Sequence, residues 1–426
     1  MMAKPTSETE RATGGPLDPG AVQARRRIDS IDLLRGIVMV VMMLDHTRDF
    51  VHSGALLFDP LDLPRTTVWV FLTRWITHYC APVFVFLAGT GAYLQFARGK
   101  SKRELSRFLI TRGLWLIILE VTVVRFLVTF SVDPKLLFFL QVIWVIGVSM
   151  IVLAGLIHLP LKIVATFGIA MIALHNLLDR YPAQPWNGPG TPVPSWGAKL
   201  WMLLHQQAFF PAGPTFPSPI IAVLYPLIPW IGAIAAGYAL GALYQMNQER
   251  RRRLLLYLGG GSVMLFCLVR AWDVYGEPQH WHRQKSFVFT ILSFINTTKY
   301  PPSLDFLLMT LGPAMLALML FDLGRGDGSW IRDFFVTFGR VPLFFYLLQW
   351  LTSHIIAIVL HVAFGKPVRW LFQTPVDWFS NPPTGNGFNL IVVYLCWIGG
   401  VLLIYPLCKW FAGVKARRRD WWLSYL

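Results

Sequence analysis

Residues 32–50 read DLLRGIVMVVMMLDHTRDF, and this stretch decides the class of protein. From Gly36 to Leu44 it contains no charged side chain, as expected for a helix that crosses a lipid bilayer. Its far end carries four ionisable side chains within five residues: Asp45, His46, Arg48 and Asp49. Because ionisable groups inside a bilayer are costly, they seldom persist there without a function. The stretch therefore predicts both a membrane helix and a functional site on it.

The whole chain has the composition of a membrane protein. Of its 426 residues 55% are hydrophobic and only 14% are charged, and the mean hydropathy is +0.52. Soluble domains carry about 25% charged residues. Apolar runs such as residues 108–130 and 388–411 match the roughly 20 residues that a helix needs to cross a bilayer. We therefore expect an all-α, polytopic helical bundle in a lipid bilayer.

About ten transmembrane helices are predicted, within a range of nine to eleven. They lie at approximately 32–53, 68–97, 107–130, 136–157, 161–178, 219–246, 254–275, 303–323, 334–363 and 388–411. The net charge of +16 comes largely from short Lys/Arg-rich segments between these spans, which is the pattern that keeps loops on the cytoplasmic side. Both termini are then cytoplasmic, and the bilayer is the inner cell membrane. This pattern also argues against nucleic acid as a partner.

The predicted domain organisation is simple. Residues 28–413 form a single transmembrane domain. Residues 1–27 are polar and rich in Pro, Gly, Ser and Glu, which predicts a disordered cytoplasmic tail. Residues 414–426 form a basic cytoplasmic C-terminal tail.

Arg35 and His46 are eleven residues apart on the first predicted span. Eleven helical steps return to nearly the same face, about 16 Å along the helix axis. Arg35 therefore lies near the cytoplasmic mouth and His46 in the outer half of the membrane. Within the outer cluster, Arg48 is expected to pair with Asp49 or with a neighbouring helix.

The second span places His78 at a depth comparable with that of His46. By helical rise His46 lies roughly 10 Å and His78 roughly 15 Å from the outer surface. Either imidazole could serve as a general base, because its pKa lies near neutrality. Asp45 could orient or charge-balance such a base, and Arg74, one turn above His78, could stabilise an oxyanion. The sequence leaves open which histidine is catalytic.

The third span carries Arg112, Glu120 and Arg125. An unpaired buried carboxylate is very costly, so Glu120 is expected to pair with Arg125 or Arg74. The sequence has no HExxH motif, so we expect no metal.

Six segments of the chain resemble one family in order along the sequence. They are RIDSIDLLRGIVMVVMMLDHTRDF, FLTRWITHYCAPVFVFLAGTGAYL, RGLWLIILEVTVVRF, YPLIPWIGAIAAGYALG, TKYPPSLDFLLMTLGPAML and FGRVPLFFYLL. These segments resemble the bacterial heparan-alpha-glucosaminide N-acetyltransferase-like proteins, which belong to a broader set of transmembrane acyltransferases. Where many relatives carry His in the last segment's helix, this chain has Gln349.

The resemblance implies an activity and a set of residues. The lysosomal member of the family takes an acetyl group from cytosolic acetyl-CoA to a glucosamine amine across the membrane. A related group of O-acetyltransferases has an Arg-Gly pair and a required His eleven residues after the Arg, which implies roles for Arg35 and His46. Their paired arginines on a later helix correspond to the region of Arg107 and Arg112.

We therefore expect a transmembrane acyltransferase that uses acetyl-CoA and acetylates an amine or hydroxyl of a sugar, glycan or polyol on the outer side. The sets of candidate residues are catalytic His46, His78 and Asp45; CoA-binding Arg35, Arg107 and Arg112; and substrate-binding or oxyanion-stabilising Arg74, Asp49 and Glu120. A transporter or flippase that uses the same His, Asp and Arg residues as a proton relay is the alternative function. The third candidate function is that of a structural or partner-binding membrane subunit. The oligomeric state is open, with a dimer as one candidate.

Overall fold

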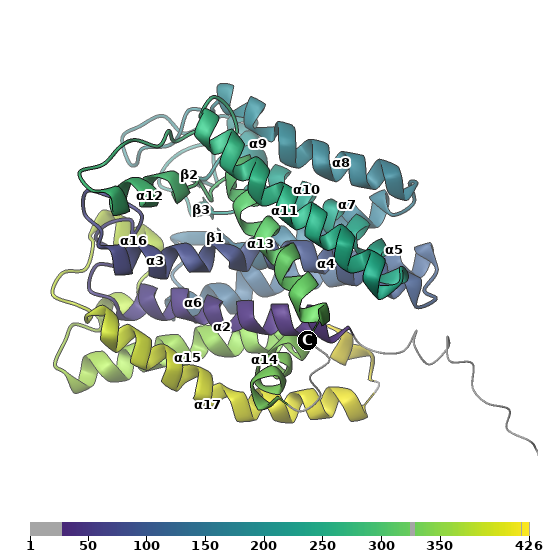
Figure 1. Cartoon of the computed structure of the whole chain (residues 1–426). Coiled ribbons are helices and arrows are strands. Elements are labelled where there is room, and N and C mark those ends of the chain that lie inside the picture. Colours follow the sequence, from purple (N-terminus) through teal and green to yellow (C-terminus); the bar gives the residue numbers. More distant parts are fainter. Residues whose placement is uncertain (1–27, 324–328, 419, 426) are drawn as a thin grey trace, which may run out of the picture.

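The computed structural model describes residues 28–323, 329–418 and 420–425. The predicted tail at residues 1–27 lies outside the described residues. The described chain is mostly helical, and Figure 1 shows long helices running side by side with connecting loops gathered at both ends.

The first half contains α2 (Asp29–Val51), α3 (Val68–Ile76), α4 (Cys80–Ala97), α5 (Lys102–Leu119), α6 (Arg125–Thr129), α7 (Val142–Leu156), α8 (Leu161–Leu174), α9 (Trp196–His205) and α10 (Ile228–Gly241). The second half contains α11 (Gln248–Trp272), α12 (Phe287–Ile295), α13 (Leu304–Leu323), α14 (Trp330–Arg340), α15 (Pro342–Ala363), α16 (Pro375–Ser380) and α17 (Leu390–Arg417). Short turns of 3-10 helix are η1 (Thr77–Tyr79), η3 (His175–Arg180), η4 (Ala242–Gln245), η5 (Arg369–Phe372) and η6 (Trp421–Ser424), and η2 (Glu120–Val124) is a π-helix.

Among the described residues, six helical segments are long and apolar enough to cross a membrane. They are Val68–Ala97, Leu161–Arg180, Gln248–Trp272, Leu304–Leu323, Pro342–Ala363 and Leu390–Arg417. The central helix α2 is not among them, because charged residues lie at both of its ends. The total of about ten spans and the sidedness of the termini stay predictions.

A small sheet departs from the all-α expectation. Strand β3 (Ile220–Val223) pairs in parallel with β1 (Leu136–Leu140) and antiparallel with β2 (Ala208–Pro211). The predicted spans at 136–157 and 219–246 therefore begin as strands and only then become α7 and α10. Short apolar runs have no periodicity that separates a buried strand from a buried helix, which is why the sequence did not reveal them.

The predicted span at 334–363 is also wrong, because it consists of two helices. Helix α14 ends at Arg340, and α15 begins at Pro342, which occupies the first position of the new helix. Proline lacks the backbone N–H that a continuing helix requires, but it fits the first turn of a new one. The break separates Arg340, at the end of α14, from Gln349 in the middle of α15.

Helix α2 lies at the centre and packs against α4, α13, α14, α15 and α17. Its contact with α14 is very close at two glycines. A Cβ atom on Gly36 would lie 1.8 Å from the carbonyl oxygen of Phe335, and one on Gly339 would lie 1.8 Å from that of Asp32. No side chain fits between these backbones, so glycine lets α14 rest directly on the part of α2 that carries Arg35.

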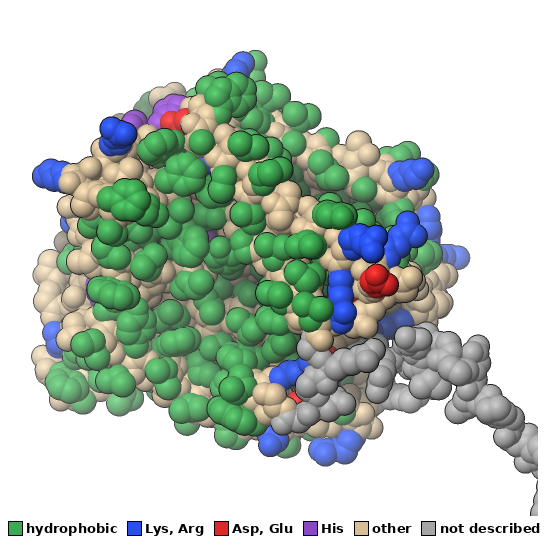
Figure 2. Space-filling view, viewed as in Figure 1, with side chains coloured by type: hydrophobic (Ala, Val, Ile, Leu, Met, Phe, Trp, Pro, Cys, Tyr) green, Lys and Arg blue, Asp and Glu red, His purple; other side chains and the backbone are tan. Residues whose placement is uncertain are grey.

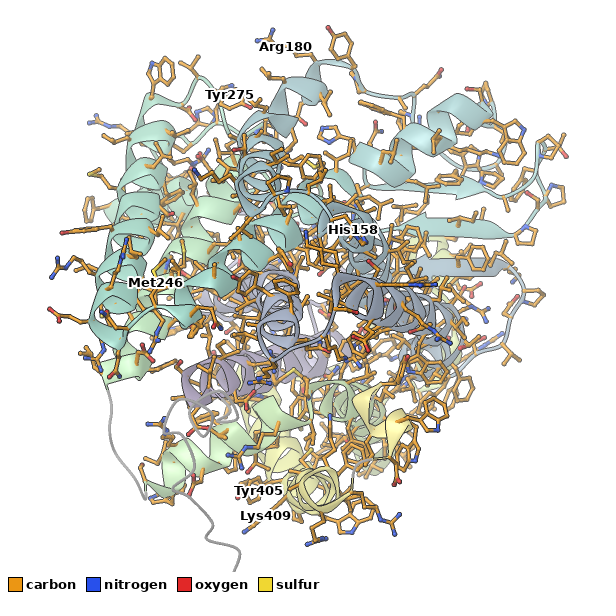
Figure 3. The ribbon with its side chains drawn as sticks, turned by 90° about the vertical axis from the view of Figure 1, so that its right-hand side faces the viewer. His158, Arg180, Met246, Tyr275, Tyr405 and Lys409 are labelled. Carbon is orange, nitrogen blue, oxygen red and sulfur yellow. The ribbon has the colours of Figure 1, made fainter. Side chains whose placement is uncertain are left out.

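The surface supports a bilayer environment. Figure 2 shows hydrophobic side chains over the middle of one face, with many Lys and Arg side chains at the right-hand end. We call this the basic end; α2, α5 and α11 begin there and α17 ends there (Figure 1). Figure 3 looks at this end, and His158, Met246 and Lys409 mark three of the segments that reach it.

The C-terminal tail predicted from residue 414 would begin within the last α-helix. Helix α17 continues to Arg417. After it, the chain folds back onto α5, where the Tyr425 hydroxyl lies 2.7 Å from Oγ1 of Thr111 and Leu423 is buried.

Candidate functional site

Two cavities of similar size lie along α2. The inner cavity, toward the basic end, has a volume of about 530 Å³. Its charged lining in the described part of the chain comprises five basic side chains and one carboxylate: Arg35, Arg98, Arg112, Arg340, Lys415 and Asp32. The deeper wall is apolar and includes Met39, Leu87 and Leu116. This cavity thus has a cationic mouth and an apolar interior.

The outer cavity has a volume of about 520 Å³ and a mixed lining. The charged and imidazole groups among its described lining residues are Asp45, His46, Arg48, Asp49, Asp59, Arg74 and Lys299. Its tyrosines and tryptophans are Tyr225, Tyr300, Tyr346, Trp350, Trp370 and Trp378. Aromatic faces beside charged groups suit a polar ligand with flat apolar faces, such as a sugar ring.

The two cavities meet at one level of the bundle. Within the described ranges, four side chains line both of them: Met42, Phe84, Val142 and Tyr346. We call these four residues the junction. Because Met42 lies between Arg35 and His46 on α2, that helix extends from the inner cavity, past the junction, into the outer cavity.

His46 is held by two neighbours on α15. Its Nδ1 lies 2.8 Å from Oε1 of Gln349, and its ring stacks on that of Trp350 with the centroids 3.6 Å apart. The amide nitrogen of Gln349 donates to the carbonyl of Tyr346 at 3.2 Å, so the amide oxygen faces His46. An amide oxygen only accepts, so Nδ1 carries the proton and Nε2 keeps the lone pair. His46 therefore has the tautomer of a general base acting through Nε2.

Asp45 forms the centre of an ion-pair network. One carboxylate oxygen lies 3.0 Å from Nη2 of Arg48, and the other pairs with Nη1 of Arg74. Arg48 also pairs with Asp49 at 2.6 Å, which confirms the expected contact. Asp45 balances two cations here, and Gln349 is the residue that hydrogen-bonds to His46.

His78 lies in a different environment from His46. It is fully buried on η1 with its ring 5.2 Å from that of Phe306, and neither ring nitrogen has a hydrogen-bond partner among the described residues. It lines neither cavity. Arg74 pairs with Asp45 and Cys80 donates to the carbonyl of Val38, so His78 lies about one helical turn nearer the basic end than His46.

The three candidate CoA-binding arginines separate into two groups. Arg35 and Arg112 line the inner cavity, whereas Arg107 is exposed on α5 and lines neither cavity. Nη1 of Arg35 donates to Oδ1 of Asp32 at 3.2 Å and to the carbonyl of Gly339 at 3.3 Å. Arg35 is thereby fixed at the contact between α2 and α14.

The prediction that Glu120 pairs with a cationic side chain is wrong. Oε2 of Glu120 accepts hydrogen bonds from the backbone N–H groups of Ile143 and Trp144, at 3.0 and 2.9 Å. These N–H groups belong to the first turn of α7, which has no intrahelical acceptors for them. Glu120 is therefore a helix cap supplied from another helix, and it lines neither cavity. Arg125 instead donates to the carbonyl of Asp133.

The sequence alone does not identify the contributions of α15 and of the loop before α13. It marks Gln349 only as a departure from relatives, and it predicts no role for Trp350 or Lys299. Lys299 lies in TKYPP, at the start of one of the segments that resemble the family, and that resemblance is the signal that could have marked it.

Outside the spans, two groups near the outer cavity have shifted pKa values. Burial raises the pKa of the Tyr300 hydroxyl, but Lys299, Arg74 and a hydrogen bond with Tyr225 together lower it by more, so the pKa falls below its ordinary value. Burial raises the pKa of Glu277, although hydrogen bonds from Ser303 and Thr298 oppose that rise. The Tyr300 hydroxyl thus lies in a positively charged environment.

The helical bundle and its hydrophobic surface define a polytopic membrane protein, with a cluster of buried ionisable groups inside the bundle. The catalytic-domain model of heparan-alpha-glucosaminide N-acetyltransferase matches residues 27–269. The chain belongs to this family, which makes it a membrane acyltransferase by class. The matched region contains Arg35, His46 and Arg112, but it ends before Lys299 and Gln349. A search of curated proteins found none that matches the chain.

Proposed function

We propose that the protein transfers an acetyl group from cytosolic acetyl-CoA to an amine or hydroxyl of a sugar, glycan or polyol on the other side of the inner cell membrane. The observation that carries this proposal is the pair of cavities that share the junction residues. A donor bound in the inner cavity and an acceptor bound in the outer cavity would meet there. We assign this activity to the domain at residues 28–413.

The inner cavity suits CoA in both charge and shape. The nucleotide end of CoA carries phosphates, which form charge-assisted hydrogen bonds with arginines such as Arg35 and Arg112. The pantetheine arm is long and thin, and it would run along the apolar wall toward Met42. The thioester would then lie near the junction, and its carbonyl would face the outer cavity.

His46 would act as the general base. The acceptor nitrogen or oxygen forms a bond to the thioester carbonyl carbon while its proton passes to Nε2 of His46. The tetrahedral intermediate collapses, the C–S bond breaks, and the CoA thiolate takes that proton from the imidazolium. The products are an amide or ester and the CoA thiol. Gln349 would keep Nδ1 protonated throughout, and Asp45 would hold Arg48 and Arg74 in place.

The outer cavity would bind the acceptor. Trp350, Trp370 and Trp378 offer aromatic faces for the apolar faces of a sugar ring, and Asp49 lies on the same lining for an amine or hydroxyl. The family name specifies a glucosaminide amine as the acceptor of the proteins it was defined on. Glucosamine is therefore the first acceptor to test.

The test uses purified full-length protein in detergent. Isothermal titration calorimetry should detect binding of CoA, and incubation with acetyl-CoA and glucosamine should release CoA thiol and form an N-acetylated sugar. Glucose and glycerol would serve as hydroxyl acceptors in the same assay. If no acyl-CoA binds while a solute crosses the bilayer of proteoliposomes, the protein is a transporter and the proposal is wrong.

A further inference from the structure

Three cations of the described residues line the outer cavity, and two of them already have carboxylate partners. Arg48 pairs with Asp45 and Asp49, and Arg74 pairs with Asp45. The third cation is Lys299, and no carboxylate of the described residues lies within 4 Å of it. Any anionic oxygen that forms in this cavity would therefore meet in Lys299 a cation whose charge no described carboxylate within 4 Å balances.

Lys299 is buried but open to the cavity. Only 8% of the residue is exposed, and its side chain lines the outer cavity. Nζ lies over two aromatic rings, 5.2 Å from the centroid of Tyr300 and 5.9 Å from that of Tyr225. Cation–π contacts of this kind hold an ammonium group in place without neutralising its charge. Lys299 also lies within electrostatic range of His46 and Asp45.

The backbone that carries Lys299 is anchored at both ends to one buried carboxylate. Glu277 accepts hydrogen bonds from the backbone N–H of Thr298 at 2.9 Å and from the Thr298 hydroxyl. On the other side of the turn it accepts a hydrogen bond from the Ser303 hydroxyl at 2.6 Å. The N–H of Ser303 closes the turn on the carbonyl of Thr298 at 2.9 Å. The position of Lys299 is therefore set by Glu277.

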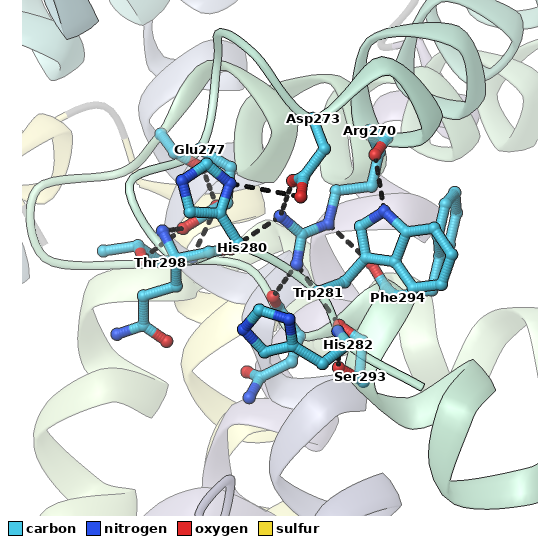
Figure 4. Close-up of polar contacts among 12 residues, drawn as sticks. Arg270, Asp273, Glu277, His280, Trp281, His282, Ser293, Phe294 and Thr298 are labelled. Carbon is cyan, nitrogen blue, oxygen red and sulfur yellow. Dashed lines mark hydrogen bonds and ion pairs between the residues drawn. The ribbon is translucent and has the colours of Figure 1, made fainter. Parts of the chain in front are cut away.

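Arg270 continues this anchor into α11. Its guanidinium, which is almost fully buried, donates to the carbonyls of Gln279, Ser293, Phe294 and Asn296 at 2.8 to 3.2 Å (Figure 4). It thereby ties the loop that contains Glu277 to the segment that precedes Thr298. The turn carrying Lys299 is thus built on a connected polar network and not on a free loop.

We propose that Lys299 is the oxyanion-binding residue of the reaction and that Glu277 positions it. The proposal rests on the acyl transfer proposed above. When the acceptor attacks the thioester, the carbonyl π electrons move onto oxygen, and the negative charge forms where the two cavities meet. The ammonium of Lys299 donates a hydrogen bond to this oxygen, and it loses that contact when the C–S bond breaks and the carbonyl re-forms. Arg74, the residue that the sequence suggests for this role, is instead held by Asp45.

The test compares Lys299→Gln with Lys285→Gln, which removes an exposed lysine from the neighbouring loop. CoA thiol release is measured with acetyl-CoA and glucosamine. Loss of an oxyanion donor typically lowers kcat by a factor of about 10² to 10³, so Lys299→Gln should lower kcat by that factor with KM for acetyl-CoA unchanged. Lys285→Gln should match the unsubstituted protein. Lys299→Arg, which keeps the charge, should retain part of the activity and guards against a variant that fails to fold.

Glu277 is tested by its coupling to Lys299. Glu277→Gln should lower kcat by about 10-fold, and the double variant with Lys299→Gln should be no slower than Lys299→Gln alone, because both changes remove one function. Additive losses would show that Glu277 is only structural.

Two results would overturn the role of Lys299. One is a kcat for Lys299→Gln within two-fold of the unsubstituted protein. The other is a higher KM of Lys299→Gln for glucosamine 6-sulfate with an unchanged KM for glucosamine. Lys299 would then recognise the charge of the acceptor. Both presuppose that the unsubstituted protein transfers acetyl groups. If it does not, the proposed function itself is wrong, so the two failures are distinguishable.

Discussion

The inner and outer cavities have nearly equal volumes but different balances of charge. Five basic side chains line the described inner cavity beside the single carboxylate of Asp32. Three carboxylates and three cations line the described outer cavity, and Asp45 alone holds two of those cations. The inner cavity therefore keeps a large excess of positive charge, whereas the outer cavity neutralises most of its own.

This difference suggests how one bundle could bind two unlike substrates. An excess of cations favours a ligand with several phosphates. In the outer cavity Asp45 already pairs with both arginines, and we propose that His46 and Lys299 are the groups that act on the reacting atoms. We propose that the cationic inner cavity selects the donor and that the groups of the outer cavity carry out the acyl transfer.

Replacing His46 should have the largest effect on the outer cavity alone. His46→Gln removes the base, so we expect kcat to fall by a factor of about 10² to 10⁴. Affinity for CoA, measured by calorimetry, should stay within two-fold because His46 lines only the outer cavity. The matched variant His78→Gln should lose far less activity, since His78 lines neither cavity. A greater loss for His78→Gln than for His46→Gln would reverse the assignment.

Replacing Asp45 tests the internal neutralisation of the outer cavity. Asp45→Asn leaves Arg48 and Arg74 without their shared counter-charge, and breaking a buried ion pair typically costs about 3–5 kcal/mol of stability. We expect a large drop in Tm, measured by thermal unfolding in detergent. Glu249→Gln, which breaks an exposed pair with Arg253, should leave Tm unchanged. Equal Tm values for the two variants would show that Asp45 does not hold the cations in place.

The contact between α2 and α14 supports the wall of the inner cavity that carries Arg35 and Arg340. Gly339→Ala places a methyl group on the backbone of Asp32, and overpacking of this kind typically costs about 1–3 kcal/mol. We expect a lower Tm together with weaker CoA binding. Gly260→Ala, where a Cβ meets nothing within 4 Å, is the control. Unchanged Tm and CoA affinity in Gly339→Ala would mean that the two helices separate without consequence.

The smallest expected effect concerns single phosphate contacts in the inner cavity. Arg112→Ala should weaken CoA binding by about 10- to 150-fold, since a hydrogen bond to a charged group contributes about 1.5–3 kcal/mol. Arg107→Ala, on the same helix but exposed, should change the affinity by less than two-fold. Equal losses would indicate a diffuse surface attraction in place of a cavity. In that case, raising the salt concentration would abolish the effect of both substitutions on CoA affinity.

The sequence predicted correctly those features that depend on one helix alone. The eleven-residue spacing places Arg35 and His46 on α2, and each side chain lines one of the two cavities. The pairing of Arg48 with Asp49 followed from adjacency and is confirmed. Periodicity along one helix is a local property, so it can be read without knowing the rest of the fold.

Contacts between distant segments could not be predicted in the same way. Gln349 lies 303 residues from His46, and no spacing rule connects α15 with α2. Glu120 is satisfied by backbone N–H groups, which every residue type but proline provides, so no sequence pattern marks its partner. The strands β1 and β3 were missed because apolar runs of four or five residues have the same composition in a strand and in a helix.

The central claim is that an acetyl group passes from the inner to the outer cavity through the junction. Proteoliposomes loaded with labelled acetyl-CoA, with glucosamine only in the outside buffer, test this directly. We predict labelled N-acetylglucosamine outside the vesicles, and its loss when Val142→Trp fills the junction while CoA still binds. Product that forms only when both substrates are on the same side of the membrane would contradict the claim.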